Sequence, residues 1–253
     1  MRTAGLWIRL TGRCNLACVG CDRGGLPSRD ATLAEVEAQL VYPYPVGEIG
    51  MCANGETLLH PQLAQVIAMC HAAHPEAKVR TVTSGMVDPS EAAGLDDLGI
   101  SMSGATKETF AIVRRLSDFD TVIETTKAAV KIIPKVSFVY TATASNLHEL
   151  PATVRLARTL GVKEVYVQPF AVIPGSNNVA PNLLLDNLPA EDRKRIVSKA
   201  KSCSDRLGVA FYHSPGVLPN VCTDEQRRNC AVPWTQVGMV QPTKTGYTIW
   251  PCC

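Results

Sequence analysis

Short segments rich in β-branched and aromatic residues alternate with helical patterns along most of the chain. The six segments predicted as strands are residues 6–10, 46–51, 78–83, 100–103, 135–141 and 163–168. Helices are predicted between them, for example at 32–40, where Thr32 and Glu35 form a capping box, and at 147–160, before Gly161. This alternation is typical of βα units and predicts an α/β fold with a parallel sheet. Six units are too few for the complete eight-stranded barrel, so an open barrel or a doubly wound sheet fits the count.

The loop after the first predicted strand holds three cysteines, Cys14, Cys18 and Cys21. Thiolates at the spacing C-x3-C-x2-C converge on one point only when they bind something, and they suit iron–sulfur clusters, zinc and copper(I). A [4Fe–4S] cube usually takes four cysteine ligands, so three leave one iron open to a ligand from outside the protein. A zinc knuckle or buried thiols are the alternatives. Zinc needs a fourth ligand close by, however, and neither cysteine nor histidine occurs between Cys21 and Cys52.

Charge and cysteine content limit the classes of partner. The net charge of +2 is near neutral, so neither a nucleic acid nor a membrane surface is predicted as a partner. No apolar run is long enough to span a membrane. Ten cysteines without a recognisable secretion signal predict a reducing, cytoplasmic location, where clustered cysteines more often bind metals than form disulfides.

The composition changes near residues 200–213, after which proline, glycine and cysteine become more frequent. Residues 209–212 could form a final strand. We therefore predict a core domain at 1–205 and a small C-terminal domain at 206–253.

Four motifs follow the predicted strands in order. They are the cysteine loop, Ala53-Asn-Gly-Glu56-Thr-Leu-Leu-His-Pro61, Thr83-Ser-Gly85, and Ile100-Ser-Met-Ser-Gly104 with Phe110-x3-Arg114 behind it. With these four motifs in this order, over about residues 5–170, the chain resembles the radical S-adenosylmethionine (SAM) enzymes. The second motif is similar to the family's Gly-Gly-Glu-Pro stretch, which holds the methionine amino group of SAM. With the strand count, the resemblance implies a partial (β/α)6 TIM-like barrel.

The resemblance also implies the cofactors and the residues that hold them. Cys14, Cys18 and Cys21 would bind a [4Fe–4S] cluster whose open iron is chelated by SAM. Reductive cleavage of SAM would then yield a 5′-deoxyadenosyl radical that abstracts a substrate hydrogen. The candidate SAM-binding residues are Gly20, Asn54, Gly55, Glu56, Thr83, Ser84, Ser103 and Gln168. The chain departs from the family pattern at Gly20, where the family usually has an aromatic ring.

A second group of cysteines surrounds a predicted hairpin, whose strands at 235–240 and 247–250 flank a turn near 243–246. Together with Cys230-Ala-Val-Pro-Trp234, this hairpin resembles the start of the family's C-terminal SPASM or twitch extension. The resemblance implies a second, auxiliary iron–sulfur cluster. Its candidate ligands are Cys222, Cys230, Cys252 and Cys253, with Cys203 as a further alternative. A zinc site or reduced thiols would also fit these residues.

The expected function is a radical SAM enzyme that oxidises or rearranges a small polar, sugar-like substrate. It would need a one-electron reductant such as flavodoxin or ferredoxin. A small substrate is favoured because no leader-peptide-binding domain is evident at the N-terminus. A peptide-modifying maturase is the alternative within the family, and a non-catalytic zinc or iron–sulfur protein is the alternative from another class. No catalytic acid, base or radical-quenching residue is identified, because Tyr140, Tyr166, Arg114, Arg115 and His213 are each more typical of structural or surface positions.

Overall fold

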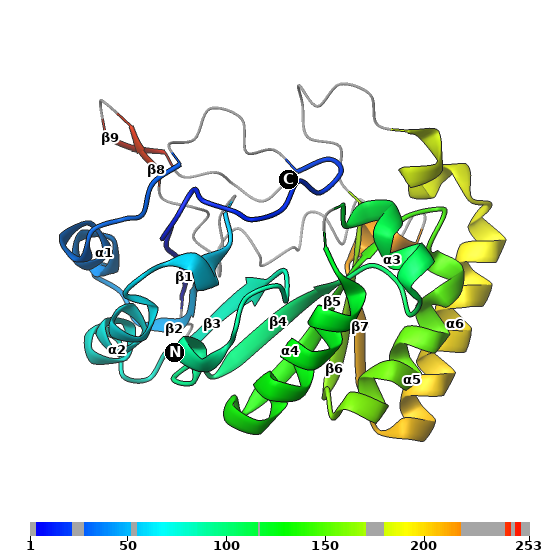
Figure 1. The fold of residues 1–253 in the computed structure, drawn as a ribbon. Coiled ribbons are helices and arrows are strands. Elements are labelled where there is room, and N and C mark those ends of the chain that lie inside the picture. Colours follow the sequence, from blue (N-terminus) through cyan, green and yellow to red (C-terminus); the bar gives the residue numbers. More distant parts are fainter. Residues whose placement is uncertain are drawn as a thin grey trace.

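The computed structural model describes residues 4–21, 28–51, 55–115, 117–170, 180–218, 241–243 and 246–248. Seven parallel strands form one curled sheet in which the spatial order is the chain order (Figure 1). They are β1 (Ala4–Trp7), β2 (Val46–Gly50), β3 (Lys78–Thr83), β4 (Asp97–Met102), β5 (Lys135–Ala142), β6 (Glu164–Pro169) and β7 (Ala210–His213). The predicted partial barrel is therefore confirmed.

The helices cover the outer side of this half-barrel (Figure 1). Each strand pairs with its predecessor, so every right-handed crossover moves the same way and delivers its helix to the same face. The α-helices are α1 (Leu33–Leu40), α2 (Leu63–Ala73), α3 (Lys107–Val113), α4 (Phe119–Ile132), α5 (Leu150–Leu160) and α6 (Ala190–Leu207). The capping box at Thr32 and Glu35 is confirmed, and Gly161 ends α5 in the left-handed conformation with φ 81°. Among the described helices, none is long and apolar enough to cross a membrane.

The two faces of the sheet differ in chemistry. Side chains alternate along each strand, and the set that faces the helices forms the core, with Ile49, Val79 and Phe138 at 0% exposure. We call the opposite set the inner face. Over the first strands it carries Trp7, whose ring fills the space a side chain at Gly50 would need. Over β4 to β7 the inner face carries Val139 and otherwise mostly small or polar residues, among them Gly99, Ser101, Ser137, Thr141, Tyr166, Gln168 and Tyr212.

The C-terminal part differs in detail from its prediction. The segment suggested as a final strand forms β7, which pairs with β6 and so extends the sheet past residue 206. The division into 1–205 and 206–253 stays a prediction. β8 (Gln241–Thr243) and β9 (Gly246–Thr248) pair antiparallel, so strands of the predicted hairpin type are present in this region. The first predicted hairpin strand, 235–240, lies outside the described residues.

The ends of β4 and β5 are joined by the fully buried side chain of Asn146. Its Nδ2 donates to the carbonyls of Ser103 (2.9 Å) and Thr141 (2.8 Å), and its Oδ1 accepts from the Thr143 amide (2.7 Å). We expect Asn146→Ala to lower the free energy of unfolding by about 3 kcal/mol, because these buried partners lose their hydrogen bonds. Urea denaturation measures this change.

The matched control is Asn182→Ala, at an exposed asparagine, with an expected change within about 0.5 kcal/mol. Equal losses in the two variants would contradict a joining role for Asn146.

Candidate functional site

The loops that carry the predicted motifs emerge at one rim of the half-barrel, the C-terminal ends of the strands. In parallel α/β folds, ligands bind at this rim. In Figure 1 the blue loop that follows β1 lies over the rim. We call residues 11–21 the cysteine loop.

The base of the cysteine loop is fixed by Asp30. Its carboxylate accepts hydrogen bonds from the Thr11 hydroxyl (2.7 Å) and from Arg13 Nε (2.9 Å), and Arg13 Nη2 pairs with its second oxygen at 2.9 Å. Partial burial raises the pKa of Asp30, but the hydrogen bonds from Arg13 and Thr11 outweigh this effect and hold the pKa below its usual value. Arg13 also donates to the carbonyl of Leu59 at 2.5 Å. The loop therefore begins from a charged, bidentate anchor.

The second motif packs directly against the cysteine loop. The amide of Glu56 donates to the carbonyl of Arg13 at 2.8 Å. At Gly55, an added Cβ would lie 2.3 Å from the carbonyl oxygen of Thr11, which leaves room for glycine alone. The backbone contact thus explains why glycine occupies this position, one of the predicted cofactor-binding residues.

Glu56 joins the second motif to the third. Its side chain is buried, with 2% exposure. Oε1 accepts from the Thr83 hydroxyl (2.9 Å) and from the Leu58 amide (3.2 Å), while Oε2 accepts from the Ser84 amide (2.7 Å). Three predicted site residues, Glu56, Thr83 and Ser84, are therefore in mutual contact. Asn54 lies outside the described residues.

The far half of the cysteine loop contacts the end of α3, which carries the fourth motif. The Val19 amide donates to the carbonyl of Val113 at 3.1 Å. Arg114 Nη1 donates to Cys18 Sγ at 3.8 Å. Within the loop, the Cys21 amide donates to the carbonyl of Cys18 at 3.3 Å. All four motifs thus touch one another through the cysteine loop and Glu56.

The ring of Phe170, just after β6, covers Gly20. This glycine is in the left-handed region with φ 68°, and a Cβ there would lie 2.3 Å from the ring. The ring of Phe170 therefore packs against Gly20, the position in the loop at which the family pattern has an aromatic residue. Phe170 belongs to a small apolar cluster with Val113 and Leu183, against which Val19 packs.

We expect Gly20→Ala to lower the free energy of unfolding by about 2 to 4 kcal/mol, because the new methyl group meets both an unfavourable φ and the Phe170 ring. In a Phe170→Ala background only the conformational part, about 1 to 2 kcal/mol, should remain. Thermal and urea denaturation measure both values.

Gly208→Ala is the matched control, since Gly208 has a similar φ of 66° but no atom within 4 Å of an added Cβ. Equal losses at Gly20 and Gly208 would show that the Phe170 contact contributes nothing.

Two of the predicted SAM-binding residues, Ser103 and Gln168, lie outside the contacts described above. Ser103 is fully buried, and its hydroxyl donates to the carbonyl of Phe110 at 3.0 Å, so it is engaged in holding α3. Gln168 is exposed near the end of β6. The exposed side chain of Gln168 suits the predicted contact with SAM better than the hydroxyl of Ser103, which already binds within the protein.

The described cysteines fall into two kinds. Cys14 and Cys18 are half-buried and Cys21 is exposed. Cys70 and Cys203 are core residues: burial raises the pKa of Cys70 to about 12, and Cys203 donates to the carbonyl of Pro151 inside the α5–α6 contact. Cys203 lies in the last turns of α6 with 5% exposure, and its place among the ligands of a second cluster stays a prediction. Cys222, Cys230, Cys252 and Cys253 lie outside the described residues.

The residues of the cysteine loop fit an iron–sulfur cluster by the chemistry of their donors. Three soft thiols share one loop, and the buried Nε of Arg114, beside Cys18, has no hydrogen-bond acceptor. Such a donor suits a group rich in sulfur acceptors and negative charge. In the described ranges, no three cysteine, histidine or carboxylate side chains are gathered closely enough to hold a single metal ion.

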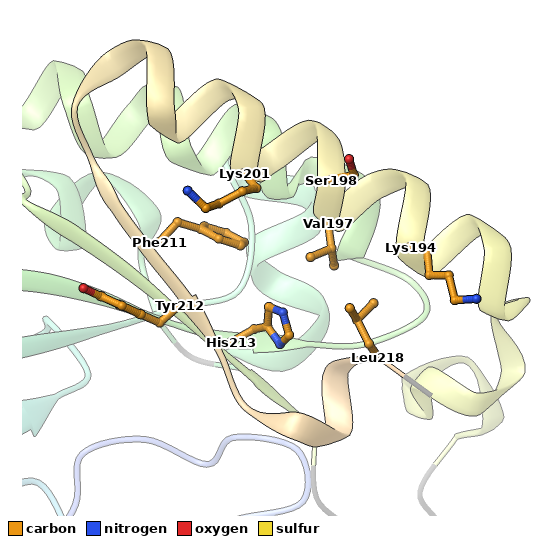
Figure 2. A pocket seen from close by; sticks show the side chains of 8 residues that line it. All are labelled: Lys194, Val197, Ser198, Lys201, Phe211, Tyr212, His213 and Leu218. Carbon is orange, nitrogen blue, oxygen red and sulfur yellow. The ribbon is translucent and has the colours of Figure 1, made fainter. Parts of the chain in front are cut away.

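A separate hollow of about 470 Å³ lies between α6 and β7 (Figure 2). It is lined by Lys194, Val197, Ser198, Lys201, Phe211, Tyr212, His213 and Leu218. Both lysines are paired, Lys194 with Glu191 and Lys201 with Asp205. No predicted site residue lines this hollow, which lies at the edge of the sheet formed by β7.

Residues 8–157, more than half of the chain, match the family model of the Radical SAM superfamily. Among curated proteins, a GTP 3′,8-cyclase of Paenarthrobacter nicotinovorans is 30% identical over 140 residues, which are 51% of this chain and 39% of the relative. An AdoMet-dependent heme synthase of Methanosarcina barkeri is 27% identical over 177 residues, 65% of this chain and 49% of the relative. The chain thus spans half or less of the length of these two relatives.

Solved structures share the fold at low identity. Streptococcus suis SuiB bound to S-adenosylmethionine superposes with a TM-score of 0.69 at 12% identity, covering 93% of this chain and 58% of SuiB. An anSMEcpe structure with bound AdoMet gives a TM-score of 0.64 at 16% identity, covering 83% of this chain and 61% of the other.

Proposed function

This chain belongs to the Radical SAM superfamily, and from that premise we propose that Cys14, Cys18 and Cys21 hold its [4Fe–4S] cluster while the adjoining rim binds SAM. Enzymes of this superfamily use a [4Fe–4S] cluster and SAM. When bound, these two groups supply an electron and a 5′-deoxyadenosyl radical, which takes a hydrogen atom from the substrate. The observation that carries the proposal is the contact of all four motifs through the cysteine loop and Glu56.

The protein's own residues bind and orient in this proposal. Asp30 and Arg13 fix the base of the cysteine loop, and Glu56 fixes the second motif to the end of β3. Since Glu56 is buried and accepts three hydrogen bonds from the protein, it shapes the SAM site by holding Gly55 and Ser84 in place. Any contact of its carboxylate with the SAM ammonium would add to that role.

We place the substrate over the inner face and propose that it is small and polar. Uncharged polar groups lie toward the rim, with Thr141 and Gln168 next to the last residues of their strands. Charges lie at the other end, where Lys135 pairs with Asp97 (2.9 Å) and Glu164 (3.0 Å). Partial burial lowers the pKa of Lys135, but these two carboxylates outweigh it and raise the pKa. Hydroxyl and amide groups of this kind recognise hydroxyl-bearing substrates by hydrogen bonds.

Two named relatives, the GTP 3′,8-cyclase and the heme synthase, carry names that refer to small molecules, which supports this substrate class. One SuiB structure is bound to its precursor peptide, but at 12% identity it bears on the fold alone. A peptide substrate is therefore the second outcome of the test below. The proposal includes a one-electron reductant such as flavodoxin or ferredoxin.

We also propose that the part of the predicted 206–253 region that follows β7 forms a SPASM or twitch extension, with an auxiliary iron–sulfur cluster on Cys222, Cys230 and Cys252, and with Cys253 as a further candidate. The β8–β9 hairpin between Cys230 and Cys252 supports this reading, because a hairpin brings its two flanks to the same end.

The direct test is anaerobic reconstitution with iron and sulfide, followed by SAM and dithionite. Mass spectrometry should detect 5′-deoxyadenosine, and samples without reductant are the control. Deuterated sugar-like and peptide candidates distinguish the substrate classes by the label they pass to 5′-deoxyadenosine. Iron-loaded protein that never releases 5′-deoxyadenosine would refute the proposal, and stoichiometric zinc on the cysteine loop would favour a non-catalytic metal protein.

A further inference from the structure

Arg114 is a cation whose side chain contacts a cysteine of the loop, Cys18. Its Nη1 lies 3.8 Å from Cys18 Sγ. Its Nε is buried and makes no hydrogen bond to the residues that the structure describes. Within the described ranges Arg114 forms no salt bridge with a carboxylate, so its positive charge is not offset by a direct partner there.

The position of Arg114 is set by the end of α3. Arg114 is the C-cap residue, and its amide still donates to the carbonyl of Phe110 at 3.2 Å while its ψ of 61° leaves the helix. The preceding carbonyl, that of Val113, accepts from the Val19 amide. Val113 and the C-cap residue Arg114 therefore hold two neighbouring residues of the cysteine loop. The guanidinium is therefore carried by the hydrogen-bonded end of a helix.

We propose that Arg114 is a positioning residue that holds a fixed positive charge against the Cys18 ligand and raises the reduction potential of the cluster. This inference rests on the proposed function, which places the cluster on Cys18. Reduction adds one electron to the cluster, and a nearby cation stabilises the more negative product more than the reactant. Hydrogen bonds to a ligand sulfur act in the same direction. The electron comes from the external reductant, so the step needs no other donor.

The adjacent residue provides a matched control. Arg115 is exposed and follows directly in sequence, so Arg115→Gln removes the same charge from the same stretch of chain without touching Cys18. Arg114→Gln keeps a polar side chain but loses the charge. Arg114→Lys keeps the charge but loses the planar guanidinium.

The test is an anaerobic redox titration of reconstituted full-length protein, followed by electron paramagnetic resonance. The signal that changes on addition of SAM reports the cluster of the cysteine loop, which separates it from a second cluster. We expect Arg114→Gln to make reduction about tenfold less favourable, a fall of about 59 mV for a one-electron couple. Arg115→Gln should match the wild type, and Arg114→Lys should lie closer to the wild type than to Arg114→Gln.

Equal potentials for Arg114→Gln and Arg115→Gln would overturn the inference, as would an Arg114→Lys potential as low as that of Arg114→Gln. If Arg114→Gln folds by circular dichroism but loads no iron while Arg114→Lys loads it, the positioning role is supported. Loss of iron in both variants overturns the role of the charge. Wild-type protein without a cluster on the cysteine loop would instead refute the proposed function itself.

Discussion

The variant that combines Cys14→Ala, Cys18→Ala and Cys21→Ala is expected to release no 5′-deoxyadenosine and to lose about four irons per chain. The physical reason is that no described cysteine can replace the lost ligands, since Cys70 and Cys203 are buried in the core at 0% and 5% exposure. Iron and sulfide analysis of the reconstituted protein measures the loss. If the triple variant retains about four irons, the proposed auxiliary cluster is established. If it retains no iron, the auxiliary cluster is ruled out.

Cys70→Ala is the control for this experiment. It removes one thiol from the core between α2 and the sheet, at a cost of about 1 to 2 kcal/mol in unfolding free energy. We expect its iron content and its 5′-deoxyadenosine yield to equal those of the wild type. A triple variant that holds as much iron as Cys70→Ala would show that the cysteine loop is not the cluster site.

Glu56→Ala is expected to have the largest effect on stability, a loss of about 3 to 5 kcal/mol. The substitution leaves three buried donors without an acceptor, among them the Ser84 amide and the Thr83 hydroxyl. It should also weaken SAM binding by cluster-loaded protein, because Gly55 and Ser84 are no longer held. Urea denaturation and calorimetry with SAM measure the two effects.

Two further variants sharpen this prediction. Glu91→Ala, at an exposed glutamate, should change stability by less than about 0.5 kcal/mol. Glu56→Gln keeps the shape but places an NH₂ group toward one of the donors, so its stability should fall between wild type and Glu56→Ala. A Glu56→Ala protein as stable as Glu91→Ala would mean that the buried contacts of Glu56 are not a source of stability.

Local patterns were sufficient to predict most of the fold. Strand residues such as those of β3 and β5 alternate in a way that needs no distant information, and Gly161 marks the end of α5 by its own conformational freedom. β7 was harder to predict, because four residues of moderate hydrophobicity become a strand through pairing with β6. β4 begins at Asp97, earlier than the predicted residue 100, since Asp97 joins the ladder opposite Lys135.

Only part of the site could be predicted, because some of its contacts join residues that are far apart in the sequence. Motif order placed the cysteine loop, Glu56 and Thr83-Ser84 at one rim, because strand ends in a parallel sheet meet there. The contacts that shape the loop could not be predicted. Arg114 reaches Cys18 across 96 residues and Phe170 reaches Gly20 from β6, and neither pair has a local sequence signal. The sequence showed that the family's aromatic residue is missing at Gly20, but it gave no sign that Phe170 covers this position.

The chain-order sheet has a consequence for how the site is assembled during synthesis. Each strand can pair as soon as it follows its predecessor out of the ribosome, because its neighbour has already been made. The cysteine loop is the earliest part of the site to be translated, yet its contacts to Val113, Arg114 and Phe170 wait for chain made much later. The base of the loop can form early through Asp30 and Glu56, but its far half lacks these later contacts until the chain has been made through Phe170. We therefore expect a cofactor site that includes these contacts to be complete only late in synthesis.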